Sequence, residues 1–386
     1  MGDATGAPGD RLIALRLPPG PRFVAELDAA WERGDAVLPV DPTWPAGAVH
    51  RALAALRPAL VVDPEGVTPL ADPVAVEPGV ALVVHTSGTT GAPKGVQLTH
   101  TALQASVRAS LDRIGARPDD RWLVCLPVAH VAGILVLLRS RLLRSEPVVL
   151  PRFDVAALAG ADATHVSLVP TQLHRLLEAG VELGRFRRIL LGGAAPPAGL
   201  LARAAAAGAT VTVTYGLSET CGGCVYDGVP LDGVDVALHA DGRIRIRGPV
   251  VMRGYRLRPD LTAAALHDGW VTTSDLGTWT ADGRLRVLGR GDDVLVTGGE
   301  QVRTGELVAL LRRHPAVRAA VVVGRDDPEW GQRVVAYCVP TDPRRPPDPD
   351  ELRAFVAAHA PRHHVPREVV VVDRLPHTSG GVGRPD

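Results

Sequence analysis

A ten-residue segment rich in hydroxyl groups and glycine contains the only lysine of the chain. Residues 86–95 read TSGTTGAPKG, and Lys94 is the single lysine among 42 strong bases in 386 residues. Glycines let a backbone approach an anion closely, hydroxyl and N–H groups donate to phosphate oxygens, and lysine adds a mobile positive charge. Because every other strong base of the chain is arginine, the lysine at position 94 indicates a role that a guanidinium does not fit. The segment predicts a phosphate-binding loop.

This segment differs from the loop of the P-loop NTPases. That loop requires Ser or Thr directly after its lysine, whereas Gly95 follows Lys94 here. A solvated Ser/Thr/Gly turn is the alternative without a function, and the specific order of ten residues disfavours it. The predicted phosphate-binding residues are Thr86, Ser87, Gly88, Thr89, Thr90, Gly91 and Lys94.

Composition narrows the class of protein. A chain of 386 residues exceeds the size at which one core keeps growing, so two or more packing units are expected. Acidic and basic residues balance at 42 each, which gives no net charge to attract nucleic acid or a membrane surface. No stretch approaches the roughly 20 apolar residues of a membrane helix, and the N-terminus has no apolar signal segment. We therefore expect a cytoplasmic protein.

The cysteines do not indicate a disulfide framework in a chain of this length without an export signal. Cys221 and Cys224 have the C-x-x-C spacing of metal and redox sites, but Cys125 and Cys338 are not arranged as a second ligand pair. A glycine-rich turn that faces the substrate is favoured over a metal or redox role.

Around these motifs, short β-branched runs alternate with Ala/Leu/Arg helical patterns, which is typical of an α/β fold. Segments 234–251 and 279–296 indicate a β-rich subdomain, with a hairpin turn at Asp282-Gly283. After residue 293 the pattern becomes that of a small α+β unit. The predicted helices are 103–114, 172–179, 200–207, 306–313 and 348–358. The predicted strands are 80–85, 188–191, 210–214, 317–323, 333–339 and 368–372.

Four ordered motifs resemble those of the acyl-adenylate-forming superfamily of acyl- and aryl-CoA synthetases, luciferases and nonribosomal peptide synthetase adenylation domains. They are residues 86–95, 215–220 (YGLSET), 269–275 (GWVTTSD, with Ser274 where glycine is usual) and 289–293 (GRGDD). The resemblance covers the chain from about Val80 onward. It implies an N-terminal ATP- and acid-binding domain over 1–289, a hinge at 290–294 and a mobile C-terminal lid domain over 295–386. It also implies ATP, Mg²⁺ and CoA as ligands.

The resemblance implies roles for single residues. Glu219 is expected to help hold Mg²⁺, and Asp275 and Arg290 to hold the ribose, which suits oxygen-seeking cations and hydroxyl donors. Asp292 is the expected hinge residue. The other residues implied in nucleotide binding are Gly193, Ala194, Tyr215, Gly216 and Ser218. The residues implied in binding the acid are His130, Gly192, Leu217 and Thr220.

Three stretches resemble the o-succinylbenzoate–CoA ligases of menaquinone biosynthesis: 126–133 (LPVAHVAG), 167–173 (SLVPTQL) and 218–228. In that family the histidine of the first stretch lies near the acyl pocket; a structural histidine is the alternative for His130. The second carboxylate of o-succinylbenzoate needs a cation or several donors, for which His130 and Arg139 are candidates. The predicted function is ATP-dependent activation of o-succinylbenzoate to its acyl-adenylate and then to the CoA thioester. Only small-molecule partners are expected, and a homodimer is an open option.

The C-terminal segment departs from the superfamily pattern L-P-x-x-x-x-G-K, whose lysine stabilises charge at the α-phosphate. Counting from Leu375-Pro376 puts Val382 at that lysine, and aligning on later residues puts Gly381 or Arg384 there. Arg384 is the predicted catalytic substitute, beside Lys94 and Glu219. Three explanations stay open: removal of the lysine or its loss with the tail, imperfect replacement by Arg384, or a natural variant with a weaker reaction. A ligase for another aryl or acyl acid and an adenylation-impaired pseudoenzyme are the alternative functions.

Overall fold

The computed structural model describes residues 9–87, 93–197, 199–290, 294–297, 300–327, 331–375, 377–378 and 381–382. The chain divides into two compact units. The larger unit comprises Met1–Ala237, Arg245–Thr272 and Trp279–Leu285, and the smaller comprises Leu238–Ile244, Thr273–Thr278 and Arg286–Asp386. The chain therefore passes between the units inside the β-rich region. The predicted boundaries at 289 and 295 stay predictions, and Asp292 lies outside the described residues.

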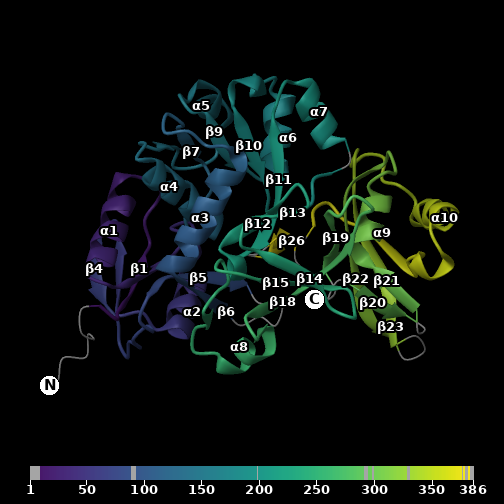
Figure 1. Cartoon of the computed structure of the whole chain (residues 1–386). Coiled ribbons are helices and arrows are strands. Elements are labelled where there is room, and N and C mark those ends of the chain that lie inside the picture. Colours follow the sequence, from purple (N-terminus) through teal and green to yellow (C-terminus); the bar gives the residue numbers. More distant parts are fainter. Residues whose placement is uncertain are drawn as a thin grey trace. The chain divides into compact units, whose positions relative to one another are not determined.

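The first sheet of the larger unit has, in the described residues, the strand order β16-β6-β5-β2-β1-β3-β4 (Figure 1). Its strands are β1 (Leu12–Leu15), β2 (Ala36–Pro39), β3 (Leu60–Asp63), β4 (Gly66–Pro69), β5 (Val80–Ser87), β6 (Pro93–Thr99) and β16 (Gly254–Tyr255). β1 runs parallel to β2 and β3, and β2 runs parallel to β5. β1 and β2 are buried at every position, as continuous apolar runs in parallel strands require. Helices α1 (Pro21–Glu32) and α2 (Ala46–Leu56) belong to this part of the chain.

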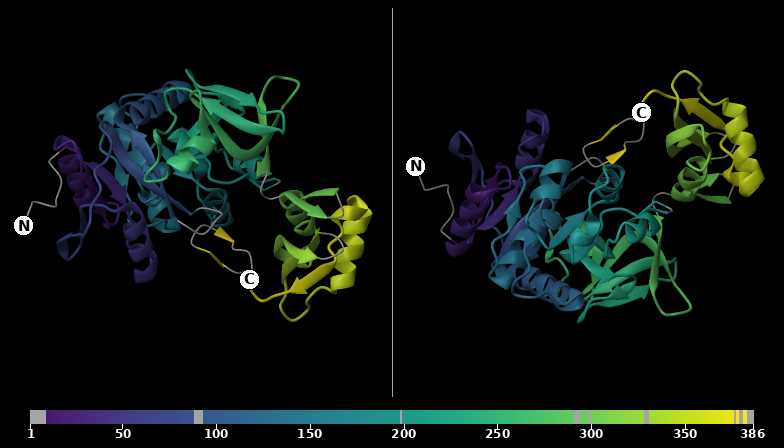
Figure 2. Two further views of the ribbon diagram at one scale, coloured as in Figure 1. Left: turned by 90° about the horizontal axis from the view of Figure 1, so that it is seen from below. Right: turned by 90° about the horizontal axis from the view of Figure 1, so that it is seen from above.

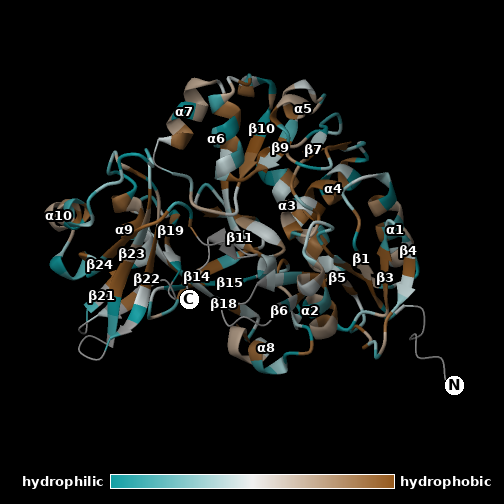
Figure 3. Cartoon of the chain, turned by 180° about the vertical axis from the view of Figure 1, so that it is seen from behind, coloured by the Kyte–Doolittle hydropathy of each residue, from teal (hydrophilic) through white to brown (hydrophobic). Residues whose placement is uncertain are grey.

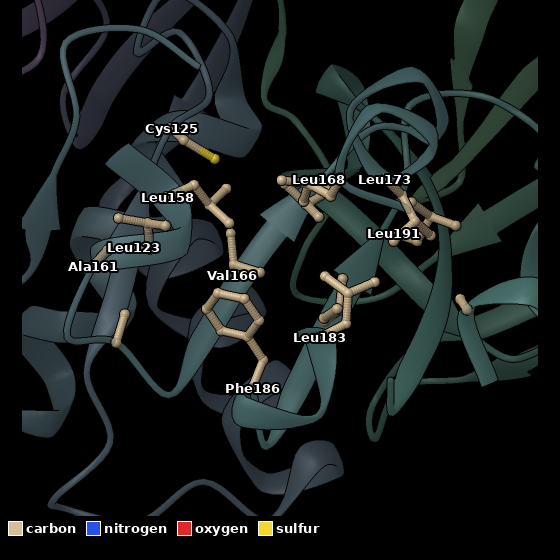
Figure 4. Packing of buried hydrophobic residues seen from close by; sticks show 14 of the residues in the cluster. Leu123, Cys125, Leu158, Ala161, Val166, Leu168, Leu173, Leu183, Phe186 and Leu191 are labelled. Carbon is tan, nitrogen blue, oxygen red and sulfur yellow. The ribbon is translucent and has the colours of Figure 1, made fainter. Parts of the chain in front are cut away.

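The second sheet has the order β13-β12-β11-β10-β9-β7-β8 among the described strands. They are β7 (Trp122–Val124), β8 (Val148–Val149), β9 (His165–Leu168), β10 (Arg188–Leu191), β11 (Val211–Leu217), β12 (Gly222–Tyr226) and β13 (Val229–Pro230). The strands from β8 to β11 are parallel, and β12 returns antiparallel to β11. Its helices are α5 (Val155–Gly160), α6 (Pro170–Glu178) and α7 (Leu200–Ala206). Figure 4 shows Phe186 directed toward Val166 in the core of this sheet, where both are almost fully buried.

Two helices connect these sheets. α3 (His100–Ile114) contacts β5, β6 and β12, and α4 (Val131–Leu143) contacts β7 and β12 (Figure 1). α3 begins at His100, earlier than predicted, because the Thr99 side chain accepts the Ala102 N–H at 3.1 Å and caps the helix. None of the described helices is both long enough and apolar enough to cross a membrane.

The β-rich region forms a third sheet of order β14-β15-β18-β17, with β19 beside β18. Its elements are β14 (Asp235–Leu238), β15 (Arg243–Arg247), α8 (Pro259–Ala265), β17 (Leu266–His267), β18 (Trp270–Trp279) and β19 (Leu285–Arg290). Between β18 and β19, Gly283 has φ 77° and its N–H donates to the Thr280 carbonyl at 2.9 Å. The predicted hairpin turn at Asp282-Gly283 is confirmed.

The smaller unit has a sheet of order β21-β20-β23-β22, with β24 beside β23. Helix α9 packs on β22 and on α10, and α10 also contacts β24 (Figure 2). The elements are β20 (Val294–Thr297), β21 (Glu300–Arg303), α9 (Thr304–Leu311), β22 (Val317–Asp327), β23 (Gly331–Pro340), α10 (Pro349–His359) and β24 (Glu368–Val371). Hydrophobic residues gather on β22 and β23 (Figure 3), and Leu307, Leu311, Val334 and Val356 are buried in the core of this unit. The mixed α/β fold with a small α+β C-terminal part is confirmed. A short antiparallel pair, β25 (His377–Thr378) and β26 (Gly381–Val382), follows.

Candidate nucleotide and acid site

The predicted phosphate loop connects two antiparallel strands of the first sheet. β5 and β6 bring Thr86 opposite Lys94 and Ser87 opposite Pro93. Gly88, Thr89, Thr90 and Gly91 lie outside the described residues. A hydroxyl and the single lysine therefore lie at the same end of a strand pair.

Close packing explains the glycine after the lysine. A Cβ on Gly95 would lie 2.5 Å from Leu56 Cδ2 and 2.8 Å from Val83 Cγ1. Real Cβ atoms do not come this close, so a side chain here would force the buried side chains of Leu56 and Val83 to shift. Gly95 thus fixes the strand that carries Lys94.

Tyr255 lies between Lys94 and Glu219. Its hydroxyl donates to Glu219 Oε1 at 2.8 Å, and Lys94 Nζ lies 5.7 Å from the centroid of its ring. Burial raises the pKa of the Tyr255 phenol well above its usual range, and the neighbouring charge of Glu219 adds to this, so the phenol stays protonated and donates. The sequence analysis did not identify Tyr255, because it lies among arginines and outside the four motifs.

A tight turn between β11 and β12 presents Glu219. A Cβ on Gly216 would lie 1.9 Å from the Gly222 carbonyl oxygen, so only glycine lets the two strands approach at this point. The Leu217 N–H donates to Thr220 Oγ1 at 2.9 Å, and the Thr220 hydroxyl donates to the Gly222 carbonyl at 2.9 Å. The Met252 N–H donates to the Glu219 carbonyl at 2.8 Å, which joins this turn to the segment before Tyr255.

This geometry changes the role of Thr220. Its side chain is fully buried and its hydroxyl is used by backbone groups of the turn. We therefore assign Thr220 to shaping the turn and not to contacting the acid. Tyr215, Leu217 and Ser218 are half-buried in the same turn.

The other predicted glycines lie at the carboxyl end of the neighbouring strand. β10 and β11 are parallel, with Leu191 opposite Val213, so the segment after β10 lies beside Thr214 and Tyr215. A Cβ on Gly192 would lie 2.4 Å from Thr214 Oγ1. Gly193 and Ala194 are exposed. Carboxyl ends of parallel strands are the usual ligand-binding edge of an open α/β sheet.

His130 precedes the first turn of α4. A Cβ on Gly133 would lie 2.4 Å from the Pro127 carbonyl oxygen, which explains the glycine three residues after the histidine. The His130 N–H donates to that same carbonyl at 3.1 Å; the residue keeps an exposed edge, although neighbouring groups desolvate much of its ring. The proline, the histidine and the glycine of this motif therefore form one compact bend.

A second histidine, which the sequence reasoning did not single out, accompanies His130. His85 precedes Thr86 on β5, and its ring contacts that of Trp44 with centroids 4.8 Å apart. Desolvation lowers the pKa of both histidines; the charge of Asp41 partly opposes this for His130, and His130 adds to it for His85. Both imidazoles are therefore neutral near pH 7, when each supplies one N–H donor.

Arg139, the other candidate for the second carboxylate, lies in the core. Its side chain is 4% exposed; Nε donates to Ser110 Oγ at 3.1 Å, and the guanidinium lies 4.9 Å from the centroid of Trp122. A guanidinium in this position packs α4 against α3 and β7 and is not available to a ligand.

The C-x-x-C pair is also buried. Burial raises the pKa of the Cys224 thiol to about 12 and that of Cys221 further still. Because the thiolate is the form that binds metals and reacts, these cysteines are unsuited to a metal or redox role. They pack the turn behind Glu219, where Ser106 donates to the Cys221 carbonyl at 2.9 Å.

The remaining predicted nucleotide ligands belong to the smaller unit. Asp275 is half-buried on β18, where its N–H donates to Thr273 Oγ1 at 3.0 Å. Arg290 ends β19 and is exposed. Arg384, like Asp292, lies outside the described residues.

Glu219 suits a magnesium ion bound together with phosphates. Its Oε1 accepts the Tyr255 hydroxyl, and Oε2 makes no hydrogen bond or ion pair to the part of the chain that the structure describes. The described residues contain no group of three or more His, Cys, Asp and Glu side chains arranged to hold a metal. Mg²⁺ commonly takes one or two carboxylates, several waters and substrate phosphates, so a single carboxylate beside a phosphate loop fits it.

Two family models match the chain. The model of the AMP-binding enzyme family matches residues 65–256, and that of the AMP-binding enzyme C-terminal domain matches residues 306–381. The chain belongs to the AMP-binding enzymes, the family that the sequence motifs predict.

Within the family, the chain is similar to proteins named for one substrate. It is 44% identical over 359 residues to the probable 2-succinylbenzoate–CoA ligase of Mycobacterium tuberculosis, covering 88% of this chain and 92% of the relative. Its structure matches the o-succinylbenzoate CoA synthetase of Bacillus subtilis in complex with the acyl-adenylate intermediate, with a TM-score of 0.86 and 28% identity over 95% of this chain and 85% of the other. The same enzyme in complex with ATP and magnesium ion matches with a TM-score of 0.84 and 27% identity, covering 95% and 86%.

Proposed function

We propose that this protein activates o-succinylbenzoate with ATP and transfers the acyl group to CoA. The observation that carries the proposal is that Thr86 pairs with Lys94 and that Tyr255 contacts both Lys94 and Glu219, because this brings side chains suited to phosphate and to a metal ion close together. The substrate follows from the relatives named above, which share most of the chain. AMP-forming acid–CoA ligation is thus the reaction class, with ATP, Mg²⁺ and CoA as its small-molecule ligands.

In the first step, a carboxylate oxygen of the acid attacks the α-phosphorus of ATP. The new O–P bond forms as the bond to the bridging oxygen of pyrophosphate breaks, and pyrophosphate leaves. Lys94, the hydroxyls of residues 86–90 and the backbone amides of the loop hold the β- and γ-phosphates in position. Glu219 holds Mg²⁺, which supplies charge neutralisation at the phosphates when bound. The catalysis is positioning and charge stabilisation.

The remaining predicted residues bind the rest of the nucleotide and the acid. Asp275 and Arg290 hold the ribose hydroxyls. The adenine side of the site is formed by Gly193, Ala194, Tyr215, Gly216 and Ser218. The acid lies against Gly192, Leu217 and His130, where neutral imidazole N–H groups of His130 and His85 supply donors for its second carboxylate.

In the second step, the CoA thiolate attacks the carbonyl carbon of the acyl-adenylate and AMP leaves. The C-terminal domain turns about Asp292 between the steps, since a short segment at the end of an element can absorb the backbone change. We place the reaction in the cytoplasm, where ATP and CoA are available. A homodimer stays our working assembly, to be measured by light scattering.

The test separates the two steps. The protein is incubated with ATP, Mg²⁺ and o-succinylbenzoate, with and without CoA, and mass spectrometry measures the acyl-adenylate and the thioester. Adenylate without CoA and thioester with CoA are expected. Benzoate and other aryl or acyl acids serve as competing substrates, and a faster reaction with one of them would reassign the substrate.

A specific observation favours a second candidate, an adenylation-impaired form of the same enzyme. Each of the three tail positions that align with the family's lysine carries another residue (Gly381, Val382 or Arg384), and the chain contains no other lysine than Lys94. Loss of one positioned donor costs roughly 10²–10³ in rate. If a chemically supplied acyl-adenylate is converted to the thioester while ATP and acid are not, this second function is correct.

A further inference from the structure

Strand pairing and a hydrogen bond to α8 hold the segment that carries Tyr255 in place. β16 pairs antiparallel with β6, with Tyr255 opposite Val96 and Gly254 opposite Gln97. The Tyr255 N–H donates to Thr262 Oγ1 at 2.9 Å, and the Thr262 hydroxyl donates in turn to the Arg258 carbonyl at 3.0 Å. The backbone of Tyr255 is therefore fixed on one side by a strand and on the other by the first turn of α8.

The next residue anchors the segment in the core. Arg256 is 3% exposed, and its guanidinium donates to four backbone carbonyls, at 2.6 Å to Leu56, 3.1 Å to Ala75, 3.4 Å to Arg57 and more closely to Val74. Its backbone N–H donates to the Gly95 carbonyl at 2.8 Å, directly beside Lys94. Burying a guanidinium costs desolvation free energy, and among the described residues only backbone carbonyls compensate this one. The cost indicates that the position of this segment matters.

The backbone on both sides of Tyr255 and Arg256 has positive φ angles, which are unfavourable for Leu257 and require glycine at Gly254. Leu257 has φ 55°, a left-handed conformation that is unfavourable for a residue with a side chain. Gly254 has φ 155°, and a Cβ there would lie 2.8 Å from Thr262 Cγ2. Strain of this kind persists where the surroundings enforce it and is concentrated near functional groups.

We propose that Tyr255 is a positioning residue of the adenylation site, whose phenol orients the Glu219 carboxylate toward Mg²⁺ and whose ring seats the Lys94 ammonium. The inference rests on the roles proposed above for Glu219 and Lys94. Because the phenol O–H occupies Oε1, Oε2 is the oxygen that would coordinate Mg²⁺. The electron-rich face of the ring attracts the ammonium, so one side chain sets the separation of the metal-binding and phosphate-binding groups.

Two substitutions separate the two contacts. Tyr255→Phe removes the hydroxyl bond to Glu219 and retains the ring beneath Lys94. Tyr255→Leu removes both. If Tyr255 only packed the segment, Tyr255→Phe would behave as wild type, because phenylalanine fills the same space. Only Tyr255→Leu would then show an effect.

The main measurement is ATP binding by calorimetry at increasing Mg²⁺ concentrations, and in EDTA. For Tyr255→Phe we expect the Mg²⁺ concentration that gives half-maximal enhancement of ATP binding to rise about 10-fold, because the variant loses a partner that orients a metal ligand. The affinity for ATP without metal should stay unchanged. For Tyr255→Leu we expect metal-free ATP affinity to fall about 2- to 5-fold as well.

Tyr226→Phe is the matched control. Tyr226 is buried in the same unit, and its hydroxyl bonds to Ser110 Oγ at 2.7 Å, in the packing of β12 on α3. The same chemical change is made there without a contact to Glu219 or Lys94. It should leave the Mg²⁺ dependence of ATP binding at the wild-type value.

The outcomes are distinguishable. Wild-type Mg²⁺ dependence in Tyr255→Phe overturns the inference, as does an equal shift in Tyr226→Phe. If the Leu variant does not fold, the Phe variant alone decides. A wild-type protein that binds Mg·ATP through Tyr255 but forms no adenylate with any acid overturns the proposed function and leaves the positioning role intact.

Discussion

The two units of the chain carry their chemistry under different constraints. In the larger unit, close packing fixes the motif residues: a side chain at Gly133 or Gly216 would collide with a backbone carbonyl, and one at Gly95 with the side chains of Leu56 and Val83. In the smaller unit, helices and strands surround a complete core, but none of the three tail positions that align with the family's lysine, Gly381, Val382 and Arg384, carries a lysine. In the larger unit, packing fixes the geometry of the site. In the smaller unit, packing of the core does not depend on a side chain of the tail. The catalytic contribution of the tail is therefore the easier of the two to lose.

The largest expected effect is in the larger unit. Lys94→Ala should lower the rate of adenylate formation by roughly 10²–10³, because it removes the single lysine beside the phosphates. Pyrophosphate release measures the rate, and Arg22→Ala, on the exposed surface of α1, is the control. Wild-type rates in Lys94→Ala would show that the phosphate loop works without its lysine.

The converse change in the smaller unit should accelerate the reaction. If Val382 stands in the place of the catalytic lysine, Val382→Lys should raise the adenylation rate by up to roughly 10², while thioester formation from supplied adenylate stays constant. Gly381→Lys and Arg384→Lys test the two other alignments under the same conditions. If none of the three is faster than wild type, the tail does not limit the first step.

Glycines of the two units should respond oppositely to alanine. Gly133→Ala should destabilise the larger unit by about 2–3 kcal/mol, because its Cβ meets the Pro127 carbonyl at 2.4 Å. Gly305→Ala in the first turn of α9 should stabilise the smaller unit by about 0.5 kcal/mol, since its Cβ meets nothing within 4 Å. Urea unfolding followed by hydrogen exchange resolves the two units. Equal effects would remove the contrast drawn above.

Acid should destabilise the larger unit through His165. Burial lowers the pKa of His165 to about 4, while the unfolded chain takes up this proton near pH 6.5. The unfolded state thus binds more protons, so this stability is complete above pH 6.5 and is lost as the pH falls through 4. We expect a loss of roughly 3 kcal/mol, measured by denaturant unfolding from pH 7 to pH 4.

Two variants check this assignment. His165→Gln should flatten the pH dependence of the unfolding free energy, whereas His50→Gln, at an exposed position, should leave it unchanged. A slope that is the same in His165→Gln and in wild type would place the acid sensitivity elsewhere.

Local pattern predicted most of the fold. Strand 188–191 coincides with β10, and the helices and strands predicted after residue 300 all occur, because their apolar residues repeat with the period of the element they form. The starts of α3 and α6 were missed by two or three residues. The Thr99 cap sets the start of α3 and Pro170 that of α6, and neither is part of the apolar pattern.

For the site, motif order predicted Lys94 and Glu219 but neither Tyr255 nor His85. Two predicted roles changed for the same reason: Thr220 and Arg139 carry suitable groups, but the structure buries both and uses their polar atoms internally. Availability of a polar atom depends on neighbours that are distant in the chain.

The sequence by itself determined the family, the order of the motifs and the types of the elements, since each rests on residues close in the chain. Only the tertiary structure decided which groups meet. Lys94, Glu219 and Tyr255 come from three separate segments, and they converge because β6 pairs with β16 while Met252 binds the turn at Glu219. Long-range strand pairing and side-chain burial set these contacts, and neither leaves a local pattern in the sequence.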